Sequence, residues 1–336
     1  MAATRFDVIG VGNAIVDVIA TADEAFLAKH GIEKGAMTLI DEPRAKTLYA
    51  AMGPGQEVSG GSAANTLAGV ASLGGRGAYI GKVADDQLGE IFAHDLRATG
   101  VDYSTAPLTG GPATARCLIM VTPDAQRSMN TFLGASTLFS KDDVDAARIS
   151  EAQITYLEGY LFDRDEAKAA FVAAADIARK AGRKVALTLS DPFCVDRHRQ
   201  SFRELIAGHV DVVFANEVEL KSLYQTDDFD AALARVRTET RIAAVTRSEK
   251  GAIIVSGEQS VSVPADKVEK LVDTTGAGDL FAAGFLLGLA RGADIETCGR
   301  LGVLAAAEVI SHVGARPLVR LADLAAERGL VLPPPA

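Results

Sequence analysis

The sequence has few of the residues on which disulfide scaffolds and metal sites depend. Its 336 residues include 3 cysteines, 5 histidines and no tryptophan. Cys117, Cys194 and Cys298 are far apart and odd in number, which excludes a disulfide framework and a paired Cys-x-x-Cys metal or redox site. We therefore expect buried thiols in a cytoplasmic protein.

Several well-known catalytic motifs are also missing. The sequence contains no Gly-x4-Gly-Lys-Ser/Thr phosphate loop, no His-Glu-x-x-His zinc motif and no Gly-x-Ser-x-Gly nucleophile elbow. The histidines lack metal-ligand spacing, so we interpret them as surface or satisfied core residues. These absences argue against a Walker-type nucleotide hydrolase, a zinc protease and a serine hydrolase.

No long hydrophobic run is present. The most apolar helix candidate, Leu280–Ala290, falls far short of the roughly 20 residues that cross a bilayer, and Asp279 precedes it. The first ten residues lack the charged and apolar regions of a secretory signal. We expect no membrane partner.

Basic residues are in deficit. The chain has 34 Lys and Arg against 44 Asp and Glu, a formal charge of −10. Nucleic-acid binding is driven by neutralising phosphates with basic side chains, so a nucleic-acid partner is disfavoured. A small phosphorylated ligand is not excluded, because a local site can be positive on an acidic protein. With 48% hydrophobic and 23% charged residues, the chain is a globular protein and not a disordered one.

Strands alternate with helices, most regularly from about residue 150. This order predicts an α/β fold with a mainly parallel sheet covered on both faces. We expect one domain over residues 1–336, with a small β flap made from about 14–44 and 106–135, and a hairpin turn at 123–126. The predicted strands are 6–11, 78–83, 113–122, 128–133, 154–159, 184–189, 210–215, 242–246 and 251–255. The predicted helices are 62–73, 86–99, 166–181, 201–208, 217–224, 277–290 and 297–311.

The strongest local motif is Asp273–Asp279, with the sequence DTTGAGD, directly before the longest apolar helix. A Gly-Ala-Gly turn that enters a helix leaves backbone N–H groups unpaired, and the helix dipole adds to their attraction for anions. Asp279 beside such an anion hole suits removal of a proton during phosphoryl transfer. The alternative is a tight turn in which Asp279 only complements the helix dipole.

A second motif, Asn216–Glu219, follows a predicted strand. Asn216 and Glu219 are suited to holding Mg²⁺ through water, since this ion keeps most of its hydration shell. The same spacing is that of a helix capping box.

Two glycine-containing segments precede polar side chains. Gly60 and Gly61 open a helix of small residues, where the backbone can approach a ligand and Asn65 can bind a hydroxyl group, although close helix packing explains them equally well. Gly10–Asp17 nearly matches a dinucleotide-binding motif, but Ile15 replaces its third glycine and no acid lies about 20 residues on. We interpret Asn13 and Asp17 as groups for a hydroxylated ligand, with a solvated turn as the alternative.

Taken together, these motifs resemble the PfkB, or ribokinase-like, family of carbohydrate and nucleoside kinases. Segment 60–75 is similar to the N-terminal signature of the family, Asp273–Asp279 to its C-terminal signature, and Asn216–Glu219 to its Asn-x-x-Glu motif. The order and spacing agree over about residues 5–325. Three motifs in register are much more specific than any one alone.

Within the family the likeness is strongest to the adenosine kinases. The segments that carry it are 12–17, 126–128, 189–193 and 214–217. The resemblance implies a three-layer αβα core with a small β lid. It also implies ATP-dependent phosphorylation of a primary hydroxyl with Mg²⁺, and adenosine as the acceptor that becomes AMP.

The resemblance also implies roles for individual residues. Asp279 is the expected general base, Gly276, Ala277 and Gly278 form the anion hole, and Arg127 closes over the phosphates from the lid. The expected substrate-binding residues are Asn13, Asp17, Gly61, Ser62, Asn65, Phe193, Leu133 and Met37, with Leu39 on the same apolar lid face. The expected ATP-binding residues are Asn216, Thr246, Arg247, Gly251, Gly276 and Gly278. Glu219 and Asn216 are expected to organise hydrated Mg²⁺, and Asp273 and Thr275, near Gly314, a monovalent cation such as K⁺.

The substrate pocket departs from the family pattern. Animal adenosine kinases place an aromatic pair around the purine where this chain has Tyr160 and Leu161. A sugar kinase of the ribokinase or fructokinase type is therefore the alternative activity. A non-catalytic nucleotide-sensing protein on the same fold is the alternative from another class, and a dehydrogenase ranks third. We expect a monomer or a homodimer.

Overall fold

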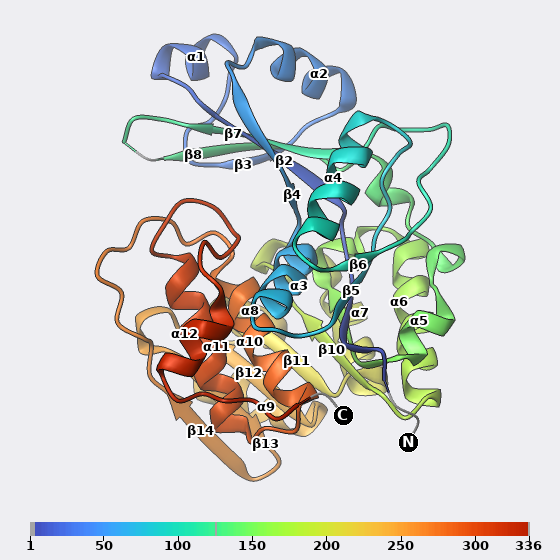
Figure 1. Cartoon of the computed structure of the whole chain (residues 1–336), viewed down its shortest axis with the longest axis vertical. Helices are drawn as coiled ribbons and strands as arrows, with labels where there is room; N and C mark the ends of the chain where they lie inside the picture. Colours follow the sequence, from blue (N-terminus) through green and yellow to red (C-terminus); the bar gives the residue numbers. More distant parts are fainter. Residues whose placement is uncertain (1–3, 125, 335–336) are drawn as a thin grey trace.

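The computed structural model describes residues 4–124 and 126–334, which form two β-sheets (Figure 1). The main sheet has nine strands. Seven neighbouring strands of this sheet run parallel, and two further strands, β13 (Ala252–Ser256) and β14 (Gln259–Val263), form an antiparallel edge. In spatial order they are β14 (Gln259–Val263), β13 (Ala252–Ser256), β12 (Ile242–Thr246), β11 (Val212–Asn216), β10 (Lys184–Thr188), β9 (Ala152–Glu158), β1 (Phe6–Val11), β5 (Gly77–Ile80) and β6 (Asp102–Tyr103).

Helices cover both faces of the main sheet, and each face has its own apolar core. In β1, Val8 packs into one core and Ile9 into the other, so this strand is buried on both sides, as is usual in parallel sheets. One face carries α3 (Ser62–Ser72), α4 (Gln87–Ala98), α10 (Ala277–Ala290), α11 (Ile295–Val309) and α12 (Leu321–Glu327). The other carries α5 (Ala146–Ser150), α6 (Asp165–Lys180), α7 (Pro192–His209), α8 (Glu217–Tyr224) and α9 (Phe229–Glu239).

A second, five-stranded sheet lies beyond one end of this core. It is formed, in spatial order, by β3 (Met37–Leu39), β8 (Arg127–Phe132), β7 (Ala115–Val121), β2 (Ile15–Thr21) and β4 (Gly55–Gly60). Helices α1 (Glu24–Lys29) and α2 (Glu42–Ala51) cover the face that points away from the core (Figure 1). Alternate residues of β2 are buried against these helices, and Ile15, Asp17 and Ile19 on the open face are only partly buried.

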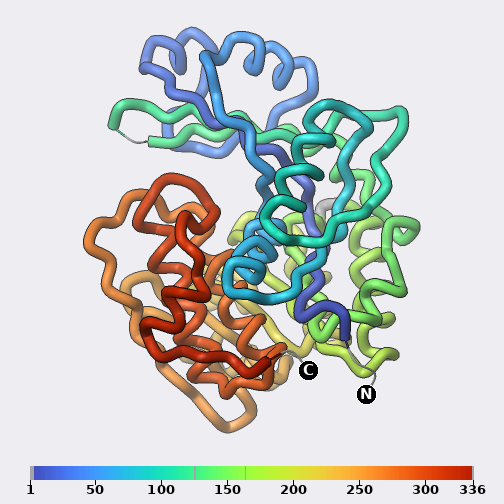
Figure 2. Tube along the Cα trace, in the orientation of Figure 1, coloured from blue at the N-terminus to red at the C-terminus, as the bar shows by residue number. Residues whose placement is uncertain are grey.

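The chain passes from the main sheet into the small sheet within three residues, between β1 and β2. It returns through β4 into α3, which begins at Ser62. The ends of the described chain lie on the side of the core away from the small sheet (Figure 2). Among the described residues, no helix is long and apolar enough to cross a membrane.

The predicted fold class is confirmed, and the predicted elements of the main sheet are present with ends shifted by a few residues. The helix predicted at 201–208 begins earlier, at Pro192. Asp191 accepts a hydrogen bond from the Cys194 N–H (2.6 Å) and Pro192 occupies the first position, both strong start signals. A non-helical residue, His198, interrupts the periodicity and explains the late predicted start.

The N-terminal segments differ more. Segment 14–44, predicted as strands and turns, contains helix α1 and the start of α2. Strands β4, β6 and β14 and helices α5, α9 and α12 were not predicted. Strands β7 and β8 pair antiparallel as predicted, although Ala125 of the predicted turn lies outside the described residues. Helix α1 has six residues and buries only Leu27, so its periodic pattern is weak. Helix α9 buries Phe229, Ala232, Leu233 and Val236 at helical spacing, so its pattern was present in the sequence and was overlooked.

Aspartates begin most of the helices. Among the described residues, seven α-helices have an N-cap aspartate that accepts a backbone N–H, which satisfies a donor that the helix leaves unpaired. They are Asp23, Asp41, Asp86, Asp145, Asp191, Asp228 and Asp294. Two helices, α3 and α10, instead begin at glycines with no side-chain cap.

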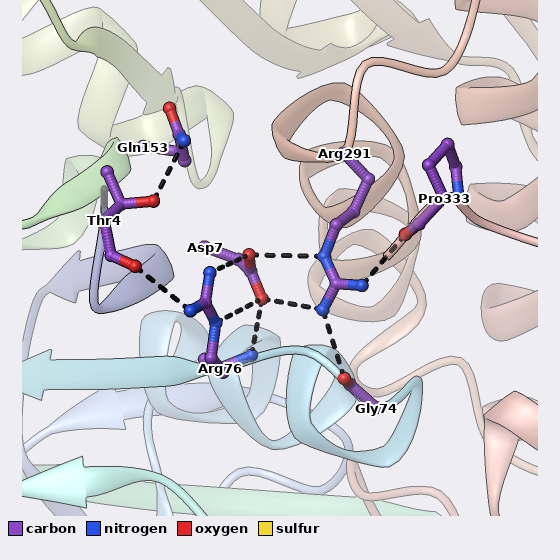
Figure 3. A network of polar contacts seen from close by, with 7 residues as sticks. All are labelled: Thr4, Asp7, Gly74, Arg76, Gln153, Arg291 and Pro333. Carbon is purple, nitrogen blue, oxygen red and sulfur yellow. Dashed lines mark hydrogen bonds and ion pairs between the residues drawn. The ribbon is translucent and has the colours of Figure 1, made fainter. Parts of the chain in front are cut away.

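A buried ion network ties the base of the core together (Figure 3). Asp7 of β1 is 1% exposed as a side chain and pairs with Arg291 (2.9 Å) and Arg76 (3.1 Å). Burial acts to raise the pKa of Asp7, but hydrogen bonds from the two arginines outweigh it and lower the pKa below its usual value. Arg291 follows the last residue of α10 and also donates to the Pro333 carbonyl (3.0 Å), so the network fixes the C-terminal segment.

Candidate active site

The carboxyl ends of the parallel strands place several predicted site residues along one edge of the main sheet. Glu158 ends β9, and Asn13 lies two residues after the neighbouring strand β1. Asn216 ends β11 and lies directly beside Thr246, the last residue of β12. Ligands of open α/β sheets bind at this edge, so the topology alone brings these groups toward one cleft.

The predicted anion turn enters α10 in the expected form. Gly276 is the N-cap with a φ of +80°, and no side chain caps the helix. A Cβ on Gly276 would lie 2.8 Å from the Ala315 Cα, whereas a Cβ on Gly278 would meet only open space. The turn therefore needs glycine at 276 for its backbone shape and leaves room for an anion beside Gly278.

Asp279 lies in the first turn of α10 and is held from α3. The Ser62 hydroxyl donates to one of its carboxylate oxygens (2.6 Å), and the Asn65 amide donates to the other (3.0 Å). Burial raises the pKa of Asp279, while these two hydrogen bonds and the charge of Arg316 oppose the rise. An oriented carboxylate with a raised pKa, next to an anion-binding turn, is suited to accept a proton.

Sequence reasoning missed Glu158, which organises the start of α3. Its side chain is buried, and it accepts hydrogen bonds from the Ala63 N–H (2.8 Å) and from the Asn13 side chain (2.9 Å). Gly61, the N-cap of α3, has a φ of +94°, and a Cβ there would lie 2.3 Å from the Asn13 carbonyl oxygen. A carboxylate as the last residue of a buried strand was the available signal.

Two buried carboxyl groups near Asp279 have raised pKa values. Burial raises the pKa of Glu158 to about 7, against hydrogen bonds from Ala63 and Asn13, and the charge of Asp279 adds to the rise. Burial raises the pKa of Asp17 to about 6, Arg316 and Arg127 oppose it, and Asp279 again adds to it. Asp17, Glu158 and Asp279 therefore share one electrostatic environment.

These shifts predict how stability depends on pH. The pKa values of Asp17 and Glu158 are higher in the folded protein than in the unfolded chain, so folding favours their protonated forms. The resulting stabilisation is complete below the unfolded values near 4 and is lost as the pH rises through about 6 to 7. We expect the free energy of unfolding, measured with urea, to fall between pH 5 and pH 8 by on the order of 4 kcal/mol from these two groups. Glu219, whose pKa burial also raises to about 7, adds to the fall.

The variant Glu158→Gln checks the source of this slope. Its amide cannot ionise, so its stability should change less between pH 5 and pH 8 than that of the wild type. An unchanged slope in this variant would show that Glu158 is not the titrating group.

Arg127 lies on β8 of the small sheet and reaches across to the loop before α10. Its Nη1 donates to Asp273 (2.5 Å) and to the Thr275 hydroxyl (2.9 Å). Asp273 also accepts from the Gly314 N–H (3.0 Å). Arg127, which was expected to close over the phosphates, is thus bonded to Asp273 and Thr275, which were expected to hold a monovalent cation. The Nε and Nη2 of Arg127 are buried without a hydrogen-bond partner.

Asn216 and Glu219 form the capping box that their spacing allows. Asn216 Oδ1 accepts from the Glu219 N–H (2.8 Å), and the Glu219 carboxylate accepts from the Asn216 backbone N–H (2.9 Å) and side-chain amide (2.6 Å). Burial raises the pKa of Glu219 to about 7, and the backbone hydrogen bond from Asn216 opposes it. Within the described residues, no group of three or more His, Cys, Asp or Glu side chains is arranged to hold a metal ion. The two residues are thus bonded to each other as the cap of α8.

The other expected nucleotide residues lie at the ends of β12 and β13. Arg247 donates to Glu217 (3.1 Å) and stacks 4.3 Å from the ring centre of Phe229. Its N–H binds the carbonyl of Gly251 (2.7 Å), which closes a short turn after Thr246. The Arg247 side chain is thus fixed on the core beside α8.

The expected substrate-facing apolar residues are exposed to different degrees. Phe193, in the first turn of α7, is 74% exposed, Met37 on β3 is 50% exposed, and Leu133 is partly buried. Tyr160 is 38% exposed, and its hydroxyl donates to the Ser190 carbonyl (3.2 Å), whereas Leu161 is buried in the core. Tyr160 is thus the member of this pair that is available to a ligand.

Three comparisons with known proteins agree with this geometry. The sequence profile of the pfkB family of carbohydrate kinases matches residues 41–320. The crystal structure of a probable sugar kinase protein from Rhizobium etli CFN 42 is 53% identical, with a TM-score of 0.91 over 98% of this chain and 100% of that one. The adenosine kinase of Sinorhizobium meliloti is 54% identical, with a TM-score of 0.89 over 96% of this chain and 99% of that one. Adenosine kinase of Saccharomyces cerevisiae is 28% identical over 90% of this chain and 94% of its own length.

The fold and the matches define a phosphotransferase that acts on hydroxyl groups. The chain belongs to the pfkB family of carbohydrate kinases. Its relatives include nucleoside and sugar kinases, and the family implies the use of ATP.

Proposed function

We propose that this protein is an adenosine kinase, which transfers the γ-phosphoryl group of ATP to the 5′-hydroxyl of adenosine and forms AMP. The observation that carries the proposal is the position of Asp279, one residue after the glycine turn and fixed by Ser62 and Asn65. The 54% identity to an adenosine kinase over nearly the whole chain supports adenosine as the acceptor.

Asp279 acts as the general base. Its raised pKa makes it a better proton acceptor than a free carboxylate, and the hydrogen bonds from Ser62 and Asn65 keep it oriented. The N–H groups of the turn 276–278 hold the transferring phosphoryl group where negative charge accumulates. Binding then places the hydroxyl in line with the phosphorus, which removes much of the entropic cost of the reaction.

Asn216 and Glu219 would hold Mg²⁺ through water. The ion supplies charge neutralisation for the phosphate oxygens of ATP when it is bound. Thr246, Arg247 and Gly251 lie beside this pair at the end of β12 and are the proposed contacts of the nucleotide. In this proposal ATP binds over β11 and β12, and the acceptor binds over the nearby strands β9 and β1.

The acceptor site lies between Asp279 and the open face of the small sheet. Asp17 and the backbone at Gly61 are the proposed contacts of the ribose hydroxyls, with Asn65 beside them. Asn13 is buried and bonded to Glu158, so we assign it to support of this wall. The proposed apolar contacts of the acceptor are Met37, Leu39, Leu133, Tyr160 and Phe193.

The small sheet acts as the lid in this proposal, and Arg127 is its phosphate contact. Two nitrogens of Arg127 have no protein partner, so they can receive phosphate oxygens while Nη1 remains near Asp273. Asp273 and Thr275 are the proposed contacts of a monovalent cation, and in this structure both accept hydrogen bonds from Arg127.

Parallel assays of ATP consumption test the function. The purified protein is given ATP and Mg²⁺ with adenosine, other nucleosides, ribose or fructose, and the phosphorylated product is identified by mass spectrometry. We expect the highest kcat/KM with adenosine. A preference for ribose or fructose would favour the sugar kinase that the Rhizobium etli relative suggests, and no turnover with any acceptor would favour a sensing protein.

Substitution of Arg127 tests the lid contact. We expect Arg127→Ala to lower kcat by about 100-fold, because a charged donor to the transferring phosphoryl group is lost. Arg320→Ala, which removes an exposed arginine paired only with Asp323, should leave kcat unchanged. Equal activities of the two variants in steady-state assays would contradict the role of Arg127.

A further inference from the structure

Arg316 is a partly buried arginine in the loop after α11, and none of the motifs in the sequence pointed to it. Its Nε donates to Asn65 Oδ1 (2.9 Å). Its Nη2 donates to the Ser59 carbonyl (2.6 Å) and hydroxyl (3.0 Å). The Ser59 hydroxyl in turn donates to Asp95 (2.5 Å), so this end of the guanidinium rests on a fixed acceptor.

The bond from Arg316 settles the orientation of the Asn65 amide. Because Asn65 Oδ1 accepts from the guanidinium, the NH₂ group of Asn65 must point the other way, and it donates to Asp279 Oδ2 (3.0 Å). A flipped amide would present a donor to Arg316 and an acceptor to the carboxylate, both repulsive. Arg316 therefore controls one of the two hydrogen bonds that Asp279 accepts from protein side chains.

The backbone beside Arg316 also supports the anion turn. Gly314 donates its N–H to Asp273, and Ala315 packs so closely on Gly276 that a Cβ there would overlap it. The loop 314–316 thus contacts the turn through two residues and the start of α3 through the third. Displacement of Arg316 would loosen both sides of the site together.

Arg316 is also the basic residue with the largest effect on the pKa values of Asp17 and Asp279. The charge of Asp279 raises the pKa of Asp17 from β2, of Glu158 and Tyr156 from β9, and of Tyr160 just after β9. All of these are neutral or negative. Arg316 lowers the pKa of Asp279 and is the leading charge that lowers the pKa of Asp17.

We propose that Arg316 is a positioning residue for phosphoryl transfer, which holds Asp279 ionised and correctly oriented by locking the Asn65 amide. This inference rests on the proposed role of Asp279 as the base. It does not depend on which acceptor the enzyme prefers, so the test uses whichever acceptor turns over fastest.

The test compares Arg316→Gln and Arg316→Lys with the wild type across pH. We expect Arg316→Gln to lower kcat by about 100-fold, through loss of alignment. We also expect the acidic limb of its kcat–pH profile to move upward by about one pH unit, because an ionised Asp279 loses its nearby cation. Arg316→Lys keeps the charge but not the planar fork, so its limb should stay near the wild-type position with kcat about 10-fold lower.

A matched control separates positioning from stability. Arg291→Gln removes another buried arginine at the far end of α10, in the network of Figure 3, and should lower the melting temperature without moving the limb. A wild-type limb in Arg316→Gln, with kcat no lower than in Arg291→Gln, would overturn the proposal. If Arg316→Gln does not fold, Arg316→Lys with unchanged kcat would overturn it as well.

Two further variants distinguish a failure of the Arg316 proposal from a failure of the proposed function. Asp17→Asn should retain the limb, which excludes Asp17 as its source. Asp279→Asn should abolish it, and a limb that persists there would refute the base assignment itself. If Asp279→Asn abolishes the limb and Arg316→Gln leaves it in place, the base stands and the role of Arg316 is wrong.

Discussion

Asp279→Asn should reduce kcat by about 10³-fold to 10⁴-fold, with little change in folding stability. The amide keeps the size of the side chain and a partner for Ser62 or Asn65, but it cannot take a proton from the acceptor hydroxyl. Steady-state kinetics with saturating ATP and acceptor measure the loss. Acceptor binding, followed by calorimetry, should remain, because the effect is confined to the transition state.

Asp294→Asn is the matched control for this substitution. Asp294 is the N-cap of the next helix, α11, and its carboxylate accepts from the Thr297 N–H (2.9 Å) far from any proposed ligand contact. Asparagine caps helices about as well, so neither stability nor kcat should change much. Near-normal turnover by Asp279→Asn would remove Asp279 as the base and return it to a dipole partner of α10.

Gly276→Ala should reduce kcat by about 100-fold and lower the melting temperature. The new Cβ would lie 2.8 Å from the Ala315 Cα, and a φ of +80° is unfavourable for alanine. The turn can relieve this contact only by moving, which takes its N–H groups away from the phosphoryl group they are proposed to hold. Kinetics and thermal unfolding measure the two effects on the same preparation.

Gly182→Ala is the control that measures the cost of a positive φ for alanine without a steric overlap. Gly182 has a similar φ of +72°, but a Cβ there would meet nothing within 4 Å. It should cost about 1 kcal/mol of stability and leave kcat unchanged. Comparable kinetics in the two glycine variants would mean that the shape of the turn at Gly276 does not matter for catalysis.

The parts of the molecule that sequence alone predicted are those encoded locally. The apolar strands of the main sheet and the helices after them have strong periodic patterns. The position of Gly276 directly before the apolar residues of α10 predicted the glycine turn. Asn216 and Glu219 illustrate the limit of local reasoning. Their spacing allowed two interpretations, a helix cap and a magnesium site, and the structure shows the hydrogen bonds of the cap.

The parts that sequence could not predict are contacts between distant segments. Glu158 reaches Asn13, 145 positions away, and Arg316 reaches Asn65, 251 positions away. Neither residue stands in a motif, because its role depends on which strand or loop lies next to it in the folded sheet. Arg127 was expected near the phosphates, but its pairing with Asp273 depends on how the small sheet is placed over the core.

The capping pattern of the helices has a consequence for selectivity among anions. Seven helices begin with their own aspartate, so their positive ends are already neutralised by the protein, and those carboxylates contribute to the net charge of −10. Glycine stands at the start of α3 and α10, and both helices begin beside Asp279. The Glu158 carboxylate accepts the Ala63 N–H at the start of α3, whereas no side chain of the described residues caps α10. The carboxylates that give this protein its acidic excess therefore also occupy seven helix N-termini and the start of α3, and the glycine turn of α10 keeps its N–H groups available to an anion.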